Sequence, residues 1–271
     1  MKWLGFLVVS FFTLMSAHAE EIRSVYVEQD DQFFQTSDPL SQVWSDVHET
    51  KVMLFPQNIA TPGMMTGSVM HAHVKTVHND TWFAVRLEWK DATRDVHLET
   101  DLSSDACAVQ LPLKSVEKTS PFMGNKNQQV AILHWKALWQ EDIEKGYQEV
   151  KDLYPNTWTD TDRFGKSVAI DAKNPVALQK RKVPVEELLA EGFGTLTTQK
   201  KQNALGRGVW KDGAWHVVFV RKLKTGDKQD PILKSGIPTS LGFAVWDGSH
   251  DDRGGRKNYA PWIALTLEGK K

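Results

Sequence analysis

The chain has 271 residues, a formal net charge of −1 at pH 7 and 41% hydrophobic residues. This length permits one large domain or two small ones, the apolar content suffices for a complete core, and the balanced charge gives no reason to expect nucleic-acid binding. The single cysteine, Cys107, excludes an internal disulfide. No pattern around this thiol supplies a base, so we interpret it as a small buried hydrophobic residue rather than a nucleophile.

The first predicted element is a secretory signal peptide over residues 1–19. Lys2 precedes an apolar stretch at residues 3–15, and a small-x-small cleavage site ends at Ala19. The apolar stretch falls short of the ~20 residues that a membrane-spanning helix needs. We therefore expect a mature chain from about Glu20 onward that is exported to the periplasm and has no membrane span after signal removal.

Alternation of apolar and polar residues predicts strands through most of the first half of the chain. Residues 78–80 (His-Asn-Asp) supply a turn between two of these strands and predict an antiparallel hairpin. A short helical turn is expected over residues 37–47, with Ser37 or Asp38 as its cap. The expected strands are residues 21–28, 51–56, 68–77, 81–89, 95–102, 106–113 and 129–136.

The pattern of apolar residues changes after Trp135. Apolar residues spaced three or four apart predict a helix over residues 138–154, and the polar residues 155–183 predict an irregular excursion. Pro184 is expected to begin a short helix over residues 184–190. Together these segments predict a partly helical insertion at about 139–202, which lacks the apolar content for its own core.

Two further pairs of strands are expected in the last quarter of the chain. Asp212-Gly213 marks the turn of a hairpin over residues 206–223, and the apolar runs 243–246 and 262–265 flank fifteen residues rich in Gly, Asp, Arg and Lys. Many short strands with peripheral helices predict a mainly β fold, an antiparallel β-sandwich forming a single domain over residues 20–271.

Several familiar chemical motifs are missing from the sequence. The chain has no Cys-x-x-Cys-His for covalent attachment of a c-type haem, no cysteine cluster and no Gly-x-Ser-x-Gly. His71 and His73 share one face of a predicted strand and are a possible metal pair, although we interpret them as ordinary half-buried histidines. His134, within an apolar run, is interpreted as a hydrogen-bonded core residue.

Two loops contain side chains that are able to bind a metal. Residues 121–124 (Pro-Phe-Met-Gly) present Met123 beside an aromatic residue, and residues 254–257 (Gly-Gly-Arg-Lys) present Lys257 after a flexible glycine pair. Taken singly, a methionine beside phenylalanine is typical of a core and a lysine in a charged loop is typical of a solvated surface.

Taken together, five motifs resemble a known family, the haem b-binding gamma subunits of periplasmic type II molybdoenzymes. That family includes the gamma subunits of ethylbenzene and dimethyl sulfide dehydrogenases, selenate and chlorate reductases, and nitrite oxidoreductases. The resemblance covers most of the chain after about Met53. The motifs are PFMG (121–124), VAILHWK (130–136), EGFGTLT (191–197), GAWHVVFVR (213–221) and AVWDGSHDDRGGRK (244–257).

The resemblance implies a β-sandwich that holds one non-covalent haem b between a methionine sulfur and a lysine amine. Matched residue by residue, these axial ligands fall on Met123 and Lys257. Trp246, Trp262 and Tyr259 are expected to form apolar walls. Arg253 or Arg256 is expected to pair with the haem propionates. Other sulfur and amine candidates remain open, namely Met53, Met64, Met65 and Met70, and Lys126 and Lys136.

The function implied by the resemblance is electron transfer without catalysis by this chain alone. Electrons would pass between an iron-sulfur subunit of a molybdenum oxidoreductase complex and a soluble c-type cytochrome of the periplasm. The alternative interpretation is a secreted β-sandwich whose aromatic residues bind a carbohydrate or another small ligand. A third hypothesis is a metal-dependent enzyme built on His71 and His73.

Overall fold

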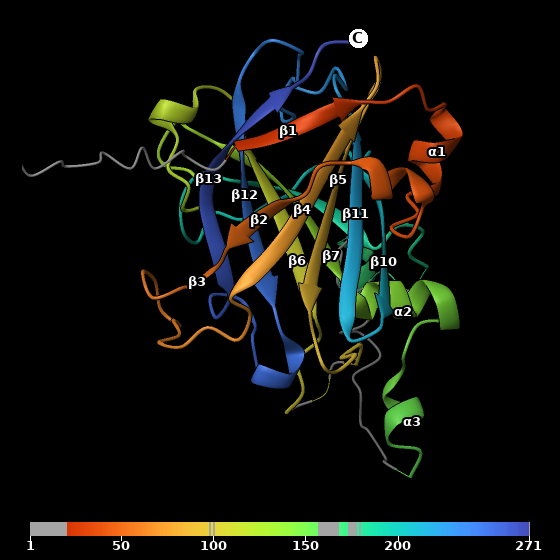
Figure 1. The fold of residues 1–271 in the computed structure, drawn as a ribbon. Coiled ribbons are helices and arrows are strands. Elements are labelled where there is room, and N and C mark those ends of the chain that lie inside the picture. Colours follow the sequence, from red (N-terminus) through yellow and green to blue (C-terminus); the bar gives the residue numbers. More distant parts are fainter. Residues whose placement is uncertain are drawn as a thin grey trace, which may run out of the picture.

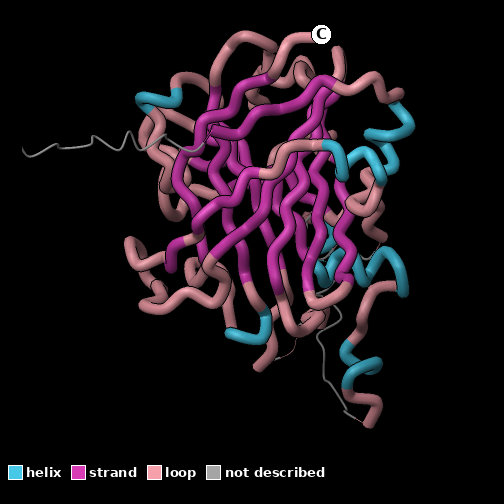
Figure 2. Tube along the Cα trace, in the orientation of Figure 1, coloured by secondary structure: helices cyan, strands magenta, loops and turns pink. Residues whose placement is uncertain are grey.

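The computed structural model describes residues 21–97, 99, 101–156, 168–172, 178 and 180–270. Strands dominate this part of the chain, and short helices lie at its periphery (Figures 1 and 2). The predicted signal peptide, residues 1–19, lies outside the described residues, as does much of the predicted excursion 155–183. Within the described part, no helix combines the length and apolarity that crossing a membrane requires.

One of the two sheets, called sheet A, contains seven strands in the described residues. Its strands are antiparallel neighbours in the order β13-β12-β6-β7-β8-β9, and β3 pairs with the start of β13. The strands of sheet A are β3 (Phe55–Pro56), β6 (Ala106–Pro112), β7 (Val130–Lys136), β8 (Val185–Ala190), β9 (Thr197–Thr198), β12 (Thr239–Trp246) and β13 (Asn258–Leu267).

The second sheet, sheet B, has the order β10-β11-β5-β4, and β2 also pairs with β4. Asp212 and Gly213 form the turn of the β10–β11 hairpin with φ angles of 53° and 73°, and such positive values are those of a turn that matches strand twist. The strands of sheet B are β2 (Thr50–Met53), β4 (His71–His78), β5 (Trp82–Lys90), β10 (Leu205–Lys211) and β11 (Ala214–Lys222).

Strand β1 (Glu21–Tyr26) connects the two sheets. Its first residues pair in parallel with β13 of sheet A, and Val25 and Tyr26 pair in parallel with β4 of sheet B. The N-terminal strand therefore joins the two sheets along one side.

The main hydrophobic core lies between the sheets. Trp89 of β5, Trp135 of β7 and Trp215 of β11 meet there with ring centroids 4.9–6.5 Å apart. All three indoles are at most 1% exposed, and Cys107, also in this core, is fully buried as predicted. The contribution of both sheets to one core confirms the antiparallel β-sandwich.

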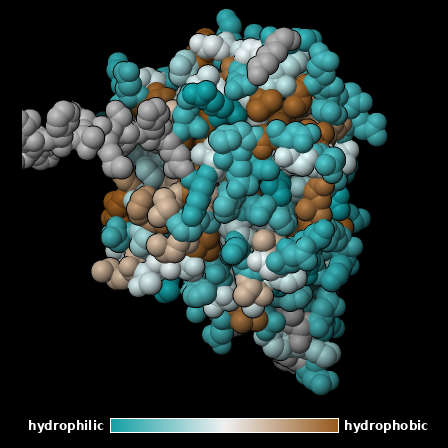
Figure 3. Space-filling view, viewed as in Figure 1, coloured by the Kyte–Doolittle hydropathy of each residue, from teal (hydrophilic) through white to brown (hydrophobic). Residues whose placement is uncertain are grey.

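The outer face of sheet B is partly covered by two short helices, α1 (Asp31–Thr36) and the 3₁₀ helix η1 (Gln42–Asp46). Phe34 of α1 stacks on Trp82 of β5 with ring centroids 6.4 Å apart, and Trp44 of η1 belongs to the same second apolar cluster. The face of the molecule shown in Figure 3 is mainly hydrophilic, with separate small apolar patches.

The expected helix over residues 184–190 is wrong, because this segment is strand β8. It pairs along its whole length with β7, from Val130 opposite Ala190 to Trp135 opposite Val185. The backbone groups of β7 need partners on that side, and this tertiary pairing overrides the helical start signal of Pro184. The segment that adds no strand to the sandwich is consequently shorter than the predicted insertion 139–202.

Two other expectations differ from the structure. The predicted strand 95–102 is a loop in its described part, with one isolated bridge between Glu99 and Leu102. The predicted helix 138–154 is two helices, α2 (Ala137–Lys145) and α3 (Val150–Leu153). The first ends at Gly146, whose φ of 103° is incompatible with a continued helix.

Candidate functional site

A cavity of about 730 Å³ lies on the outer face of sheet A. Its floor consists of side chains that alternate along the strands with those of the core: Ala106 and Ala108 flank the buried Cys107, and Ala244 lies between the core residues Phe243 and Val245. Successive side chains of a strand point to opposite faces, so these small residues all leave space on one side. The volume falls in the range of roughly 300–1,000 Å³ that is typical of ligand and cofactor pockets.

The walls of the cavity come from segments far apart in the sequence. They are residues 57, 59–62, 121–123, 193–194, 196, 252–255 and 257, with Leu138 and Trp139 of α2. The strands therefore supply a rigid floor, and the loops supply the side chains that surround a ligand.

Met123 lines the cavity from the loop before β7. Its backbone has a φ of 63°, a left-handed conformation that costs a residue with a Cβ roughly 1–2 kcal/mol. The Met123 carbonyl accepts a hydrogen bond of 2.7 Å from the Gly192 N–H, and the side chain packs against the apolar cluster on this face. Among the methionines of the described residues, Met123 is the one that lines the cavity.

Lys257 reaches the same cavity from the loop between β12 and β13. The Trp246 indole N–H donates to the Gly254 carbonyl at 3.1 Å, and the Gln57 N–H donates to the Lys257 carbonyl at 2.9 Å. A side chain on Gly255 would place its Cβ 2.5 Å from the Pro62 carbonyl oxygen, so the close approach of these two loops requires glycine.

The Lys257 amine is in a poorly solvated environment. Burial lowers its pKa from 10.5 to about 8, because the charged form loses hydration. Its Nζ lies 5.2 Å from the centroid of the Trp246 ring. Cation–π attraction to this ring partly offsets the hydration that the charged amine loses. An amine with this pKa loses its proton far more readily than a solvated lysine.

The two predicted aromatic residues also line the cavity. Trp246 is buried and its ring centroid lies 5.0 Å from that of His134, whereas Tyr259 contacts Phe122 edge-on at 5.6 Å. Trp262 lies beside the cavity, where its indole N–H donates to the Thr119 carbonyl at 2.8 Å. Two of the three expected aromatic walls are thus in place around one space.

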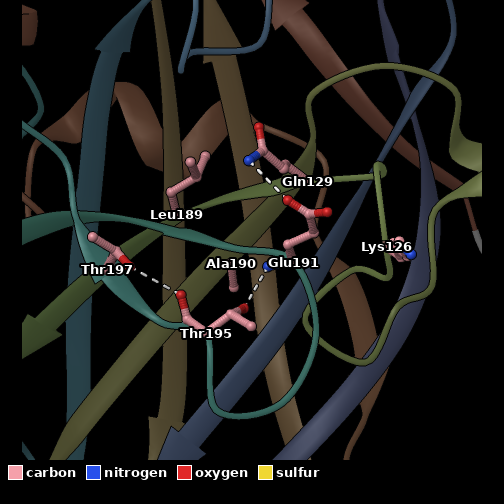
Figure 4. Close-up of a pocket in the computed structure, with 7 residues that line it drawn as sticks. All are labelled: Lys126, Gln129, Leu189, Ala190, Glu191, Thr195 and Thr197. Atoms are coloured by element: carbon pink, nitrogen blue, oxygen red, sulfur yellow. Dashed lines mark hydrogen bonds between the residues drawn. The ribbon is translucent and has the colours of Figure 1, made fainter.

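The structure separates the two arginine candidates. Arg253 is exposed and lines the rim of the cavity, whereas Arg256 is exposed and lies outside the lining. The two amine alternatives are separated as well, because Lys136 lines the cavity and Lys126 does not. Lys126 borders a different, smaller hollow of about 320 Å³ beside β8 and Glu191 (Figure 4).

His134 faces the cavity rather than the core, which differs from the interpretation as a hydrogen-bonded core residue. Its Nε2 is shielded from solvent and has no hydrogen-bond partner among the described residues. Burial lowers the pKa of His134 well below its ordinary value, and the positive charges of Lys136 and Lys257 lower it further. Alternation along the strand could have predicted this orientation, because His134 shares one strand face with Ile132 and Lys136, and all three line the cavity.

The two histidines of β4 have no cluster of further metal ligands around them among the residues that the structure describes. His73 Nδ1 lies 2.6 Å from Glu49 Oε1, and neither His71 nor His73 belongs to a group of three or more potential ligands in the described part of the chain. Both side chains are half-buried, as the preferred interpretation states.

Among solved structures, a carbohydrate-binding module of family 9 from Caldicellulosiruptor kristjanssonii, in complex with glucose, shares 11% identity with this chain. The likeness covers 93% of this chain and 97% of that structure, with a TM-score of 0.43.

Comparison of the sequence with known proteins finds a matching family model and two relatives. The model of the ethylbenzene dehydrogenase family matches residues 41–258. A protein of Haloferax mediterranei described as a respiratory nitrate reductase heme subunit is 24% identical over 251 residues, which are 92% of this chain and 73% of that protein. The chlorate reductase subunit gamma of Ideonella dechloratans is 26% identical over 234 residues, 85% of this chain and 76% of that protein. The chain therefore belongs to the ethylbenzene dehydrogenase family, the molybdoenzyme gamma-subunit family that its motifs resemble.

Proposed function

We propose that this chain is an electron-transfer subunit that binds one haem b non-covalently in the cavity on sheet A, with Met123 and Lys257 as axial ligands of the iron. The observation that carries the proposal is that a thioether and a poorly solvated amine, 134 residues apart in the sequence, line one cavity. Neither side chain alone distinguishes a ligand from a surface or core residue.

The residues of the cavity fit a haem. A flat, largely apolar group needs a smooth floor and aromatic walls, which the alanines of β6 and β12 and the side chains of Trp246 and Tyr259 supply. The thioether of Met123 is a soft ligand that favours ferrous iron, and the amine of Lys257 is a harder donor. Bound haem would supply one-electron chemistry between the ferric and ferrous states.

The protein prepares Lys257 for this role by lowering its pKa. A lysine ligates a metal only as the neutral amine, so binding must displace a proton. At a pKa of about 8 that displacement is easier than at 10.5. Arg253 at the rim is available to pair with propionates, and Arg256 is exposed nearby on the same loop.

The wider role is supported by the names of the two relatives, one a heme subunit and the other a gamma subunit of a reductase. We propose that the chain joins a molybdenum catalytic subunit and an iron-sulfur subunit in the periplasm, and exchanges electrons with a soluble c-type cytochrome. With both axial positions taken, no position remains for a substrate, and the chain is not catalytic by itself.

The test is the absorption spectrum of the full chain produced with ample haem, compared with Met123→Ala and Lys257→Ala. We expect a six-coordinate low-spin spectrum in the wild type and its loss in each variant. Met65→Ala and Lys126→Ala are matched controls, since Met65 is 88% exposed and Lys126 lies outside the cavity. Circular dichroism checks that each variant folds.

Two outcomes would contradict parts of the proposal. An unchanged low-spin spectrum in either cavity variant removes that residue as a ligand. A folded wild-type chain that stays colourless and shows no Soret band on addition of hemin removes the haem, and titration with soluble sugars then tests the alternative of a carbohydrate-binding module.

A further inference from the structure

Four aspartates converge at one end of the sandwich, beside the cavity assigned to the haem but outside its lining. Asp91 directly follows β5 of sheet B, Asp95 and Asp105 lie in the loop before β6 of sheet A, and Asp247 directly follows β12 of sheet A. One carboxylate oxygen from each aspartate lies within 4.8 Å of those of the other three. In Figure 1 this is the lower end of the molecule, where β5 and β12 end.

The negative charge of this cluster is not balanced by lysine or arginine. Asp91, Asp105 and Asp247 are at most 5% exposed, and Asp95 is half-buried. Within the described residues, none of the four forms an ion pair with a lysine or arginine, and the partly exposed His250 pairs with Asp247 at 2.8 Å. Buried carboxylates at this spacing repel each other strongly unless a cation or protons intervene.

Asp91 has an oxygen without a partner. Its Oδ1 accepts from the Thr93 N–H at 3.1 Å, but its Oδ2 is shielded from solvent and makes no hydrogen bond to any described residue. Burial and the charge of Asp247 raise the pKa of Asp91 to about 6. The Trp89 indole N–H faces the same carboxylate and offsets a small part of this rise, but it makes no hydrogen bond of normal geometry. Such an oxygen is costly to bury unless it has a ligand.

We propose that Asp91, Asp95, Asp105 and Asp247 bind one calcium ion. Calcium takes oxygen ligands at about 2.3–2.6 Å, so opposite ligands of one shell are up to about 5 Å apart, which accommodates the spread of the four oxygens. Magnesium, with ligands at about 2.0–2.1 Å, requires a tighter octahedron. The group contains neither cysteine nor histidine, which argues against a soft metal.

The hydrogen bonds already made by the cluster leave room for a metal. Asp105 Oδ2 accepts from the Asp95 N–H and the Trp215 indole, both at 2.8 Å, and Oδ1 accepts from the Gly248 N–H at 2.8 Å. Since each carboxylate oxygen has two lone pairs, Oδ1 retains one for a cation. These bonds orient Asp105 before any ion binds.

A calcium ion here would connect the two sheets. Asp91 belongs to the end of sheet B, whereas Asp105 and Asp247 belong to sheet A, and Asp247 is also the first residue of the loop that carries Lys257. The ion would therefore stabilise the closed sandwich and the start of that loop. This inference does not depend on haem binding.

Calcium binding is tested on the full chain after treatment with a chelator, by calorimetric titration with calcium and separately with magnesium, together with thermal unfolding. We expect one calcium per chain, weaker magnesium binding, and a higher unfolding temperature with calcium. Asp91→Asn and Asp95→Asn should each weaken calcium binding by at least about tenfold, because each removes one charged ligand. Asp95→Asn also covers the case in which Asp91→Asn does not fold.

The matched control is Asp251→Asn, which makes the same charge change four residues after Asp247 in an exposed position. Asp251 has a φ of 56°, which asparagine tolerates, so the control should bind calcium as the wild type does. Failure of the folded wild-type chain to bind calcium would overturn the proposal, and so would unchanged affinity in both Asp91→Asn and Asp95→Asn.

Discussion

At the scale of single residues, the candidate site depends on how the fold changes the chemistry of ordinary side chains. A methionine beside a phenylalanine and a lysine in a charged loop carry little information in isolation. In the structure, Met123 adopts a left-handed backbone conformation, and burial lowers the pKa of Lys257 to about 8. Both features cost folding free energy, and both are typical of residues retained for function.

The cost of burying Lys257 predicts a pH-dependent effect of Lys257→Met in the haem-free chain. A lysine whose folded pKa lies below its unfolded pKa binds fewer protons when folded between those two values, so the free energy of unfolding rises with pH across that window. The shift from 10.5 to about 8 corresponds to about 3 kcal/mol. Lys257→Met should therefore be more stable than the wild type at pH 7, and the difference should shrink between pH 8 and 10.5.

Urea unfolding at several pH values measures this difference. Lys126→Met, outside the cavity, should show no comparable gain. A Lys257→Met variant that is less stable than the wild type at pH 7 would mean that contacts of the ammonium group outweigh its desolvation.

At the scale of elements, alternation in the sequence predicted most strands, including the hairpin that turns at Asp212-Gly213. It failed for β8, where a proline and two glutamates resemble the start of a helix. The segment forms a strand because the backbone groups on one side of β7, about fifty residues earlier in the chain, need hydrogen-bond partners. Local preference is weak compared with the hydrogen bonds and burial that such pairing provides.

Strand β10 shows a contact that no local pattern predicts. Gly208 packs against the indole of Trp135 from the opposite sheet so closely that a Cβ would lie 2.2 Å from a ring carbon. The Gly208 N–H also donates to Gln140 Oε1 of α2 at 3.0 Å. The edge strand of sheet B therefore contacts β7 of sheet A and α2 directly.

Gly208→Ala should destabilise the protein by about 1–3 kcal/mol, because the large buried ring must move to accept the methyl group. Guanidinium unfolding followed by tryptophan fluorescence measures the change. Gly269→Ala is the control, since its Cβ would meet nothing within 4 Å, and it should change stability by less than about 0.5 kcal/mol. Equal stability of Gly208→Ala and the wild type would show that the edge strand moves without cost.

At the scale of the whole molecule, one core holds both sheets together, and the cavity proposed to bind haem lies on the outer face of sheet A, outside that core. Cys107 reports on the core because its side chain is fully buried between the sheets. Burial also raises the pKa of the Cys107 thiol well above its ordinary value, so the reactive thiolate is rare as well as inaccessible.

We expect Cys107 to resist a maleimide reagent for as long as the native sandwich persists. Labelling should follow global unfolding, because core strands open with free energies close to that of global unfolding. Mass spectrometry after reaction with and without guanidinium measures it, with glutathione as the control for reagent activity. Complete labelling of the native chain at the rate of glutathione would show that the sheets separate readily.

The sequence by itself determined the class of fold, the family, and the two side chains proposed to bind iron, since period-two patterning and long motifs are local properties of the chain. Tertiary structure alone decided that Met123, Lys257 and His134 share one cavity, that Arg253 rather than Arg256 lines it, and that Lys126 lies elsewhere. It also decided the meeting of the four aspartates. The physical reason is that cavities, lowered pKa values and clustered charges arise from segments brought together by sheet pairing, whereas the sequence pattern records only neighbours along the chain.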